Sequence, residues 1–427
     1  MANAKAIINV ENIVLSDKAR KYVIVSAAGK KDKNDTKITD ILYKCAELYK
    51  TGGAWQEEFI KVKNRYCEIA KDLNIEIDLD KIFSAIQKEI LLCNGGADYF
   101  ASRGEYLSAV LFAKKINYPF IDAAELIIFD SDGKLDAGGT NKLASKALAK
   151  KEYAVIPGFY GRDKSGKIKT FSRGGSDITG AIIARAVKAD VYENWTDVNG
   201  FMASDPRVVE NPKQITELTY KELRELSYMG ASVLHADSVF PVSKSNIPIN
   251  IKNTFCPSDK GTFILPAKMA KEPKRIVTGI AGRKDYSVIF IEKAMMNSEL
   301  GFARKVLSVF EREGISLEHM PTGIDTMSII AETSLLNGKL DNVIKKIKRA
   351  VKPDSIHVEH EISLIATVGR GMANIPGTSA RLFSAVAKAG VNIVMIDQGS
   401  CEINIILGIK NADYEKAVRA IYNEFFS

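Results

Sequence analysis

The sequence is poor in the residues that build disulfide and zinc sites, because its five cysteines are scattered and form no C-x-x-C pair. It has no apolar run of the length that a membrane span needs. Residues 1–20 also lack the apolar core and cleavage site of a secretory signal. These absences exclude a disulfide framework, a zinc module and a membrane anchor. We therefore expect a protein of the reducing cytoplasm.

Motifs of two common nucleotide-binding classes are also missing. No G-x-x-x-x-G-K-[ST] segment occurs, which excludes a P-loop kinase. No helix-turn-helix, zinc-finger or RNP signature supports nucleic-acid binding. The formal net charge of +8 comes from lysines and arginines spread along the chain, which suits an enzyme with anionic ligands. We expect no nucleic-acid partner, and the sequence predicts no metal site made of protein ligands alone.

The first 268 residues alternate short apolar segments with helical patterns. Strands that alternate with helices predict a mainly parallel sheet covered by helices on both faces, a three-layer αβα domain of the α/β class. The expected strands are 21–26, 126–129, 153–157, 191–195 and 248–253. The expected helices are 39–49 and 176–188, and residues 55–115 show helical periodicity with little proline or glycine.

A polar stretch with three prolines, between residues 257 and 274, follows this region and predicts a domain boundary. Beyond it lies a weak internal repeat, hereafter the first repeat (287–320) and the second repeat (363–396). Both have the layout strand, glycine-containing loop, amphipathic helix, glycine, strand. Each is followed by another strand, at 326–332 and 401–409.

This layout resembles a tandem pair of ACT domains, which are amino-acid-sensing units of ferredoxin-like (βαββαβ) fold. The turns Gly301-Phe302 and Gly377-Thr378, which precede the two helices, favour ligand-binding loops. Two ferredoxin-like units with a purely structural role fit the same pattern. The predicted domains are 1–268, 276–360 and 361–427.

The segment RGGSD, Arg173 to Asp177, stands between a predicted strand and a predicted helix. Its two glycines allow close backbone approach to a ligand, and amides at a helix N-terminus bind anions. Arg173 can hold a carboxylate with its guanidinium fork. Asp177 can position a lysine that neutralises phosphate. Alone, a Gly-Gly turn before a helix is mostly just a tight turn, so the segment by itself is weak evidence for a ligand site.

Other motifs accompany it in a fixed order. WTDVNGFMASDPR (195–207) places Thr196 and Asp197 at the carboxyl end of a strand, where α/β sheets bind ligands. SAAGKKDKNDTKITDIL (26–42), SRGEYLSA (102–109) and MGASVLHADSV (229–239) complete the series. In this combination, and along residues 1–427, the chain resembles the aspartate kinase family of the amino acid kinases.

The resemblance implies transfer of the ATP γ-phosphoryl group, with Mg²⁺, to the side-chain carboxylate of L-aspartate. The product, 4-phospho-L-aspartate, begins the biosynthesis of lysine, threonine and methionine. It implies a phosphoryl-transfer site of Ser26, Ser176 and Asp177, and aspartate contacts from Thr39, Glu105 and Arg173. The implied nucleotide contacts are Thr196, Asp197, Met202, Arg207, Ser232 and Val233.

Three of these residues also have simpler interpretations. Glu105 fits an exposed position on a helix, Thr39 fits the N-cap of helix 39–49, and Arg207 fits a surface ion pair. Met202 and Ser232 stand where the family often has tyrosine and lysine, and Ser172 replaces a common glycine. Lys244 or Lys252 is our guess for the missing charge.

The family begins with a strand that ends in K-x-G-G-[ST]-S, whose lysine neutralises the transferring phosphoryl group. No such segment occurs here, and residues 1–17 align with the helix that follows it. We therefore expect that about 5–10 residues are missing before Met1, and that the chain as written is weakly active or inactive.

For the repeats, the resemblance implies that the first unit binds an end-product amino acid at the interface of a homodimer. Glu318 or Asp325 would pair with an ammonium group, which makes lysine the first expectation and threonine the second. A solvent-facing position fits Glu318 nearly as well. The remaining implied contacts are Met296, Ser298, Gly301, Phe302 and Ala303 in the loop and Ser316 and Leu317 on a facing strand.

Two competing functions remain open. Another kinase of the same fold would act on glutamate, acetylglutamate, a carbamate or UMP, although the paired repeats and TDVNGFMASDPR disfavour it. A non-catalytic amino-acid sensor would keep the repeats without turnover, and the absent first strand favours it. Retention of Glu105, Arg173 and Asp177 disfavours the sensor.

Overall fold

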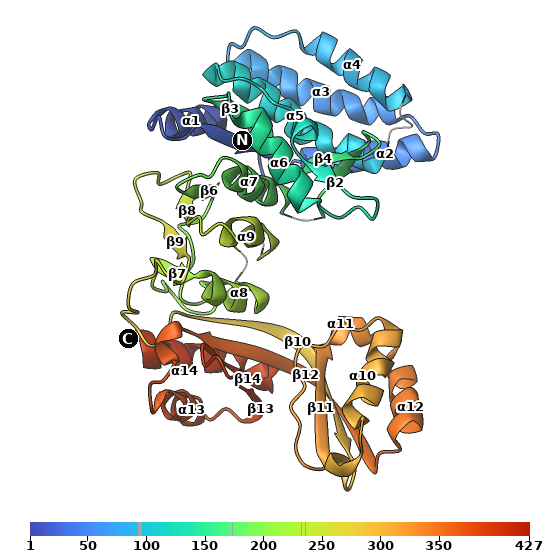
Figure 1. The fold of residues 1–427 in the computed structure, drawn as a ribbon, viewed down its shortest axis with the longest axis vertical. Helices are drawn as coiled ribbons and strands as arrows, with labels where there is room; N and C mark the ends of the chain where they lie inside the picture. The colour runs from blue at the N-terminus through green and yellow to red at the C-terminus, as the bar shows by residue number, and fades with distance from the viewer. Residues whose placement is uncertain (93–95, 173, 232, 235) are drawn as a thin grey trace. The chain divides into compact units, whose positions relative to one another are not determined.

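The protein is described by a computed structural model that covers residues 1–92, 96–172, 174–231, 233–234 and 236–427. The chain forms two compact units, each built from two segments (Figure 1). The first unit contains Met1–Gly200 and Val233–Met269, and the second contains Phe201–Ser232 and Ala270–Ser427. No helix among the described residues is long and apolar enough to span a bilayer.

The first unit is built on short, mostly parallel ladders, as the apolar segments predict. The expected strand 126–129 begins only at Ile128, because Leu126 is the C-cap of a 3₁₀ turn at Ala123–Glu125. The parallel pairs are β1 (Tyr22–Val25) with β3 (Ala154–Pro157), β2 (Ile128–Phe129) with β4 (Tyr160–Asp163), and β6 (Tyr192–Thr196) with β8 (Ile249–Asn253). The antiparallel neighbours are β5 (Ile168–Thr170) on β4 and β9 (Thr262–Leu265) on β8.

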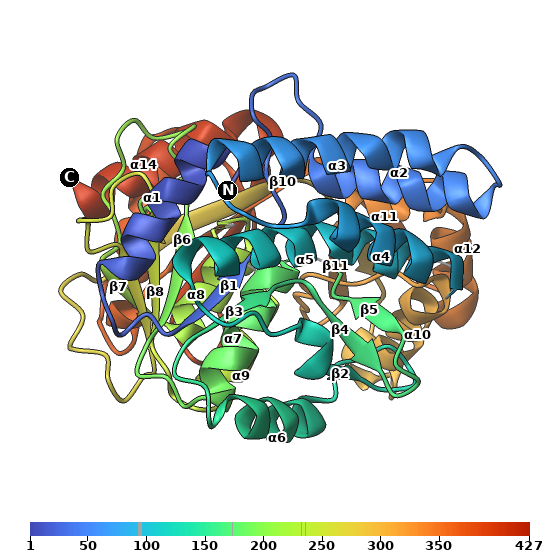
Figure 2. The same cartoon turned by 90° about the horizontal axis from the view of Figure 1, so that it is seen from above.

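Helices of the first unit pack around α5 (Ala97–Ile116), which is buried on nearly all sides (Figure 2). Such a helix has no polar face, so its sequence shows little amphipathic periodicity. Trp55 contacts Phe59 and Phe100 edge to face in the adjoining core. The other helices are α1 (Ala4–Leu15), α2 (Ile38–Lys50), α3 (Trp55–Asp72), α4 (Leu79–Leu92), α6 (Ala137–Leu148), α7 (Gly175–Ala186) and α9 (Ala236–Ser243).

The second unit contains one antiparallel sheet in the order β11-β10-β12-β14-β13. Its two long strands are antiparallel and run beside both repeats. Residues 279–283 of β10 pair with residues 364–368 of β12, and residues 288–292 of β10 pair with residues 355–359 of β12. The strands are β10 (Gly279–Glu292), β11 (Thr326–Glu332), β12 (Ser355–Val368), β13 (Ile393–Asp397) and β14 (Asn404–Lys410).

Helices and a small N-terminal segment complete the second unit. Gly301 and Gly377 both adopt the left-handed conformation directly before a helix, at φ of 77° and 85°. The matching glycines confirm that the two repeats share a local layout. The elements are β7 (Glu217–Thr219), α8 (Tyr220–Tyr228), α10 (Phe302–Glu313), α11 (Thr333–Leu336), α12 (Leu340–Val351), α13 (Thr378–Lys388) and α14 (Tyr414–Phe426).

Candidate functional site

Glu105 lies inside the first unit, on the buried helix α5. Its residue surface is only 5% exposed, and its Oε2 atom has no hydrogen-bond partner. Burial raises the pKa of this carboxyl to about 8, although an Ala27 amide hydrogen bond opposes the shift. The exposed-helix interpretation of Glu105 is therefore wrong. A buried carboxyl with one unused oxygen is typical of a site that awaits a cationic ligand group.

The loop that follows β1 packs directly on α5. The Tyr66 hydroxyl donates to the Gly104 carbonyl at 2.6 Å and lies 3.0 Å from the Ser108 hydroxyl. It also accepts from the Ala28 amide at 3.4 Å. A Cβ atom at Gly104 would lie 2.8 Å from the Ala27 Cβ, so only glycine allows this approach. Tyr66 thus ties the exposed Ser26 loop to the Glu105 helix, a role that no sequence motif signalled.

Arg103, which precedes Gly104 on α5, is buried between aromatic rings. Its guanidinium carbon lies 4.3 Å, 4.7 Å and 5.4 Å from the ring centroids of Tyr99, Tyr106 and Tyr160. Cation–π contacts and the Ser102 hydroxyl replace water around the charge. Sequence reasoning missed Arg103, although tyrosines four residues before and three after an arginine share its helix face.

The start of α7 lies against the loop after β3. The helix begins at Gly175, one residue earlier than predicted, after Gly174 in the left-handed conformation. Ser176 packs so closely on Gly158 that a Cβ there would lie 2.5 Å from the Ser176 Oγ. Asp177 accepts a hydrogen bond of 2.8 Å from the Asn194 side-chain amide on β6. Arg173, the remaining residue of this motif, lies outside the described residues.

Phe159 marks local backbone strain at the same place. Its φ of +78° is unusual for an aromatic residue, and such strain concentrates at functional sites. The Phe159 amide donates to the Thr179 hydroxyl at 3.1 Å, and its carbonyl accepts from the Phe171 amide at 2.9 Å. The two bonds hold the turn that carries Gly158 against the N-terminus of α7.

Thr196 and Asp197 occupy the carboxyl end of β6, as predicted. The Thr196 carbonyl accepts from the amide and the hydroxyl of Thr254, at 2.9 Å and 3.0 Å. Asn253, at the end of β8, donates to Asn199 at 2.5 Å. The ends of two parallel strands therefore meet at one edge, where the exposed Asp197 carboxylate faces solvent.

The other predicted contacts are dispersed. Thr39 lies in the first turn of α2 and is not its N-cap, because Lys37 holds that position without a side-chain bond. Met202 and Arg207 belong to the second unit; the Arg207 side chain is 89% exposed and pairs with Asp205 at 2.7 Å. The ion-pair interpretation of Arg207 is thus confirmed. Ser232 lies outside the described residues, and Val233 is half-buried in the first unit.

Both lysines suggested to supply the missing positive charge already contact other groups of the protein. The Lys252 ammonium donates to the Asp259 carbonyl at 2.8 Å and lies over the Trp195 ring. The Lys244 ammonium lies over the Phe240 ring, 4.5 Å from its centroid. Within the described residues, no group of three or more metal-binding side chains occurs.

The predicted effector loop surrounds the start of α10. Met296 and Phe302 are buried, Ser298 ends a 3₁₀ turn and Ala303 is half-buried, whereas Asp325 is exposed. Ser316 and Leu317 do not form the expected strand, because pairing with β11 is limited to two isolated bridges, Thr322 with Met327 and His319 with Ile330.

Glu318, beside this bridge, is not solvent-facing as one interpretation held. Its Oε2 atom is buried without a partner. Burial and the adjacent Glu318 carboxylate raise the pKa of Tyr228, at the end of α8. The carboxylate therefore lies beside α8, within the same compact unit.

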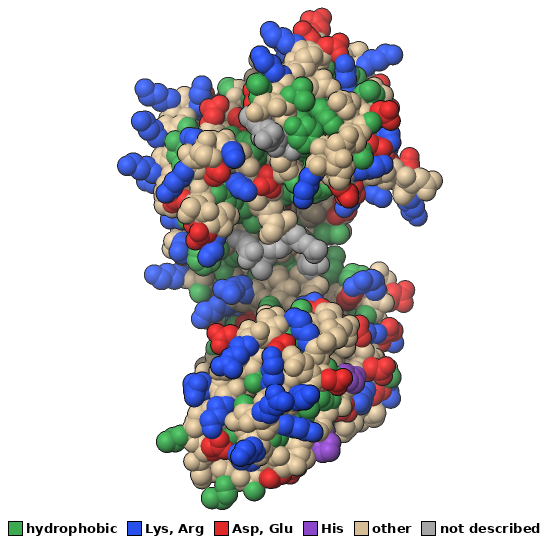
Figure 3. All heavy atoms as spheres, turned by 90° about the vertical axis from the view of Figure 1, so that its right-hand side faces the viewer, with side chains coloured by type: hydrophobic (Ala, Val, Ile, Leu, Met, Phe, Trp, Pro, Cys, Tyr) green, Lys and Arg blue, Asp and Glu red, His purple; other side chains and the backbone are tan. Residues whose placement is uncertain are grey.

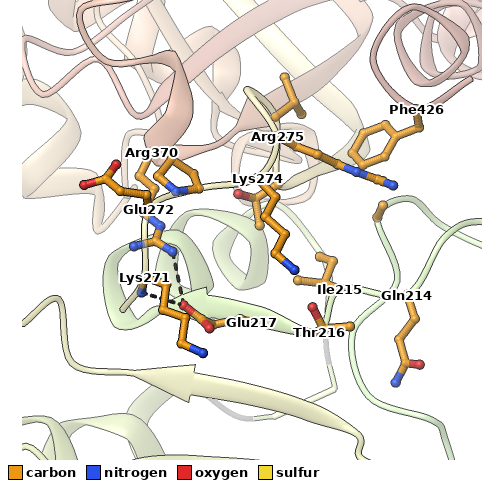
Figure 4. Close-up of a pocket in the computed structure, with 14 residues that line it drawn as sticks. Gln214, Ile215, Thr216, Glu217, Lys271, Glu272, Lys274, Arg275, Arg370 and Phe426 are labelled. Atoms are coloured by element: carbon orange, nitrogen blue, oxygen red, sulfur yellow. Dashed lines mark hydrogen bonds and ion pairs between the residues drawn. The ribbon is translucent and has the colours of Figure 1, made fainter. Parts of the chain in front are cut away.

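A pocket of about 330 Å³ lies in the second unit, near the start of β10 (Figure 4). Glu217 accepts from the Arg370 guanidinium at 3.2 Å and from the Lys271 amide at 3.1 Å. The Arg275 guanidinium stacks on the Phe426 ring. The Glu217 and Arg370 charges of this pocket are thus paired with each other.

Comparisons with known proteins agree with this geometry. Residues 6–253 match the model of the amino acid kinase family, and residues 365–425 match an ACT domain model. Aspartokinase 3 of Bacillus subtilis is 39% identical over 100% of this chain and 97% of its own length. A crystal structure of Clostridium acetobutylicum aspartate kinase, described as an allosteric enzyme, superposes with a TM-score of 0.92. It is 50% identical over 100% of this chain and 97% of its own.

A more distant structure shares the fold. Escherichia coli aspartokinase III, in complex with aspartate and ADP, gives a TM-score of 0.78 at 23% identity over 100% of this chain and 97% of its own. The same enzyme has been solved with lysine and aspartate, with a TM-score of 0.76.

Proposed function

Because this chain belongs to the aspartate kinases of the amino acid kinase family, we propose that it phosphorylates the side-chain carboxylate of L-aspartate. The γ-phosphoryl group of ATP is transferred, and the product is 4-phospho-L-aspartate. The observation that carries the proposal is Glu105, a buried carboxyl with an unused oxygen beside the Ser26 loop. An ammonium group is the ligand that such an oxygen accepts best.

Each part of the site has a proposed role. Glu105 binds the amino group of aspartate, Arg173 binds its α-carboxylate, and Thr39 adds a further contact. The backbone amides at the start of α7 face the transferring phosphoryl group with Ser176 and Ser26, since helix N-termini attract phosphate. Phosphoryl transfer needs alignment and neutralised charge more than covalent catalysis by the protein.

ATP is proposed to bind at the edge formed by β6 and β8. Thr196 and Asp197 contact it there, with Met202, Arg207, Ser232 and Val233 as further contacts. Mg²⁺ neutralises phosphate charge and is held largely by phosphates and water. The Asp177 carboxylate fits this chemistry as a protein ligand, because Asn194 fixes its orientation while the residue stays partly accessible.

Feedback control is proposed for the first repeat. Lysine is the first candidate effector and threonine the second, bound near Gly301 with Glu318 or Asp325 on the ammonium group. The unused Glu318 oxygen supports Glu318 over Asp325. A homodimer completes this site, the product feeds lysine, threonine and methionine biosynthesis, and the reaction occurs in the cytoplasm. The domain limits remain those proposed above, 1–268, 276–360 and 361–427.

Trapping of the acyl phosphate with hydroxylamine tests the proposal. The chain as given, and the chain extended upstream through a K-x-G-G-[ST]-S segment, are incubated with ATP, Mg²⁺ and aspartate, and separately with glutamate, acetylglutamate, carbamate or UMP, with and without lysine. ADP release is measured beside hydroxamate, because UDP formed from UMP is not an acyl phosphate and gives no hydroxamate. We expect both products only from aspartate, chiefly with the extended chain, and a lower rate with lysine. Turnover of another acceptor would favour a different amino acid kinase. No turnover together with lysine binding would favour the non-catalytic sensor.

A further inference from the structure

A groove lies between the two helices that cover the first repeat. α10 and α12 line it with eight residues, and it encloses about 430 Å³. Along α10 it runs from Arg304 to Arg312, which is about 12 Å at the rise of an α-helix. Arg304 also lies beside Gly301, the residue that precedes α10. The groove is therefore elongated and begins next to the loop of the first repeat.

Five of the eight lining residues are cationic, and none of the eight, all of them described, is acidic. Lys305 pairs with Glu299 at 2.6 Å, and Lys346 pairs with Glu313. For Arg304, Arg312 and Arg349, no acidic partner is found among the described residues. Three guanidinium groups thus share one groove without neutralisation, and Figure 3 shows basic side chains gathered on this side of the second unit.

The second repeat provides an internal reference for this charge. Its helix α13 carries Ala380 at the position of Arg304, and Arg381 at that of Lys305. The Arg381 Nε atom donates to Glu424 at 2.7 Å, and its guanidinium lies over the Phe425 ring. In the second repeat, the arginine on α13 is therefore neutralised by Glu424 on α14. A cationic groove is not a general consequence of this fold.

We propose that the groove between α10 and α12 binds the polyphosphate portion of a small anion. Guanidinium groups hold phosphate oxygens with paired hydrogen bonds, and Ser308 adds a hydroxyl donor. Several phosphates in a row match the elongated placement of Arg304, Arg312 and Arg349. The lining contains no aromatic ring on which a base could stack, which favours a polyphosphate over single-stranded nucleic acid.

The polyphosphate can belong to an inorganic chain or to a nucleotide, and one binding experiment separates these sources. Inorganic tripolyphosphate, orthophosphate and a nucleoside tetraphosphate are titrated into the full chain by calorimetry. The triple variant R304Q/R312Q/R349Q is compared with wild type, and R381Q/K388Q in the second repeat is the control. All three groove arginines are exposed, so the variant is expected to fold.

We expect tripolyphosphate affinity to fall about tenfold or more in the triple variant and to change less than about twofold in the control. Orthophosphate should bind far more weakly than tripolyphosphate. If the triple variant still binds the nucleoside tetraphosphate more tightly than tripolyphosphate, the nucleoside contacts a site other than the groove. Equal tripolyphosphate affinity in wild type and triple variant, or no binding to wild type, would overturn the proposal.

A fluorescent single-stranded RNA is titrated in parallel. Binding of RNA that depends on the three arginines, without binding of tripolyphosphate, would replace the small anion by a nucleic acid. Binding at the groove is independent of the kinase reaction proposed above. The hydroxamate assay on the triple variant should therefore give wild-type turnover, and the two proposals can fail separately.

Discussion

Two glutamates, one in each compact unit, are almost equally buried and have opposite surroundings. Glu105 is 5% exposed and leaves Oε2 without a partner. Glu222, on α8, is 1% exposed, and its carboxylate accepts from Thr219, Thr278 and the Arg370 amide at 2.6–3.1 Å. The Arg370 guanidinium lies 3.7 Å away. Burial alone therefore does not point to a functional acid, whereas burial with an unused oxygen is the feature on which the role proposed for Glu105 rests.

The contacts of Glu222 indicate a structural role. Its carboxylate forms a capping box with Thr219 at the start of α8, a reciprocal pair that satisfies the helix end. The same carboxylate reaches Thr278 before β10 and Arg370 after β12. The Glu222 side chain thus joins three segments of the second unit, and its hydrogen bonds contribute to the stability of the fold.

The largest expected effect is the pH dependence that Glu105 gives to stability. The pKa of Glu105 is raised from its ordinary value of 4.5 to about 8 by burial. Its contribution to stability is therefore complete below pH 4.5 and is lost as pH rises through 8. Relative to E105Q, which has no titrating group there, wild type should lose on the order of 4 kcal/mol.

Urea unfolding between pH 5 and pH 9 measures this difference, with E222Q as the matched variant. A wild-type curve parallel to that of E105Q would show that Glu105 is already ionised in the free protein. The raised pKa on which the contrast between Glu105 and Glu222 depends would then be wrong.

Truncation of the satisfied glutamate should have the next largest effect. E222A leaves Arg370 and the start of α8 without their acceptor, so we expect a loss of about 3 kcal/mol in the free energy of unfolding. E415A, which removes an exposed pair with Arg419, is the control and should cost about 0.5 kcal/mol or less. Similar losses in both variants would contradict a structural role for Glu222.

Substitution of the unsatisfied glutamate should act on catalysis instead. E105Q keeps the shape of the side chain but removes the charge proposed to hold the aspartate amino group. We expect kcat/KM for aspartate to fall about a hundredfold, equal to roughly 3 kcal/mol. E47Q, on the exposed face of α2, controls for a general effect of the substitution. Wild-type kinetics in E105Q would remove Glu105 from the site.

The smallest expected effect concerns the loop beside Glu105. Y66F removes the hydroxyl that bonds the Gly104 carbonyl, and should cost about 1 kcal/mol of stability. Because the Tyr66 hydroxyl also accepts from the Ala28 amide in the Ser26 loop, KM for aspartate should rise. A stability loss without any kinetic change would limit Tyr66 to the core.

Local patterns predicted much of this molecule. The apolar segments around β1 and β8 and the helices α2 and α7 were each found within two residues of their expected bounds. The matching turns at Gly301 and Gly377 were readable because a left-handed residue before a helix favours glycine. These features depend on neighbours in the sequence, so the sequence carries them directly.

Distant pairings were not predictable in the same way. The pattern of the first repeat suggested a full strand near residue 318, yet only two isolated bridges pair this segment with β11. The buried role of Arg103, within the SRGEYLSA segment, was not predicted because its stabilisation comes partly from Tyr160, far along the chain. Asn194, which holds Asp177, resembled any polar residue in a strand. Such roles emerge only when separate segments meet in the folded core.

The long strands β10 and β12 have a consequence for inheritance. Residues 279–283 of β10 pair beside the second repeat, and residues 288–292 pair beside the first. The strand irregularity between these halves contains Asp285, at a φ of +72°. A recombination event that exchanged one repeat would cut a strand that the other also needs. The pair must therefore be transmitted, duplicated or replaced as one genetic block.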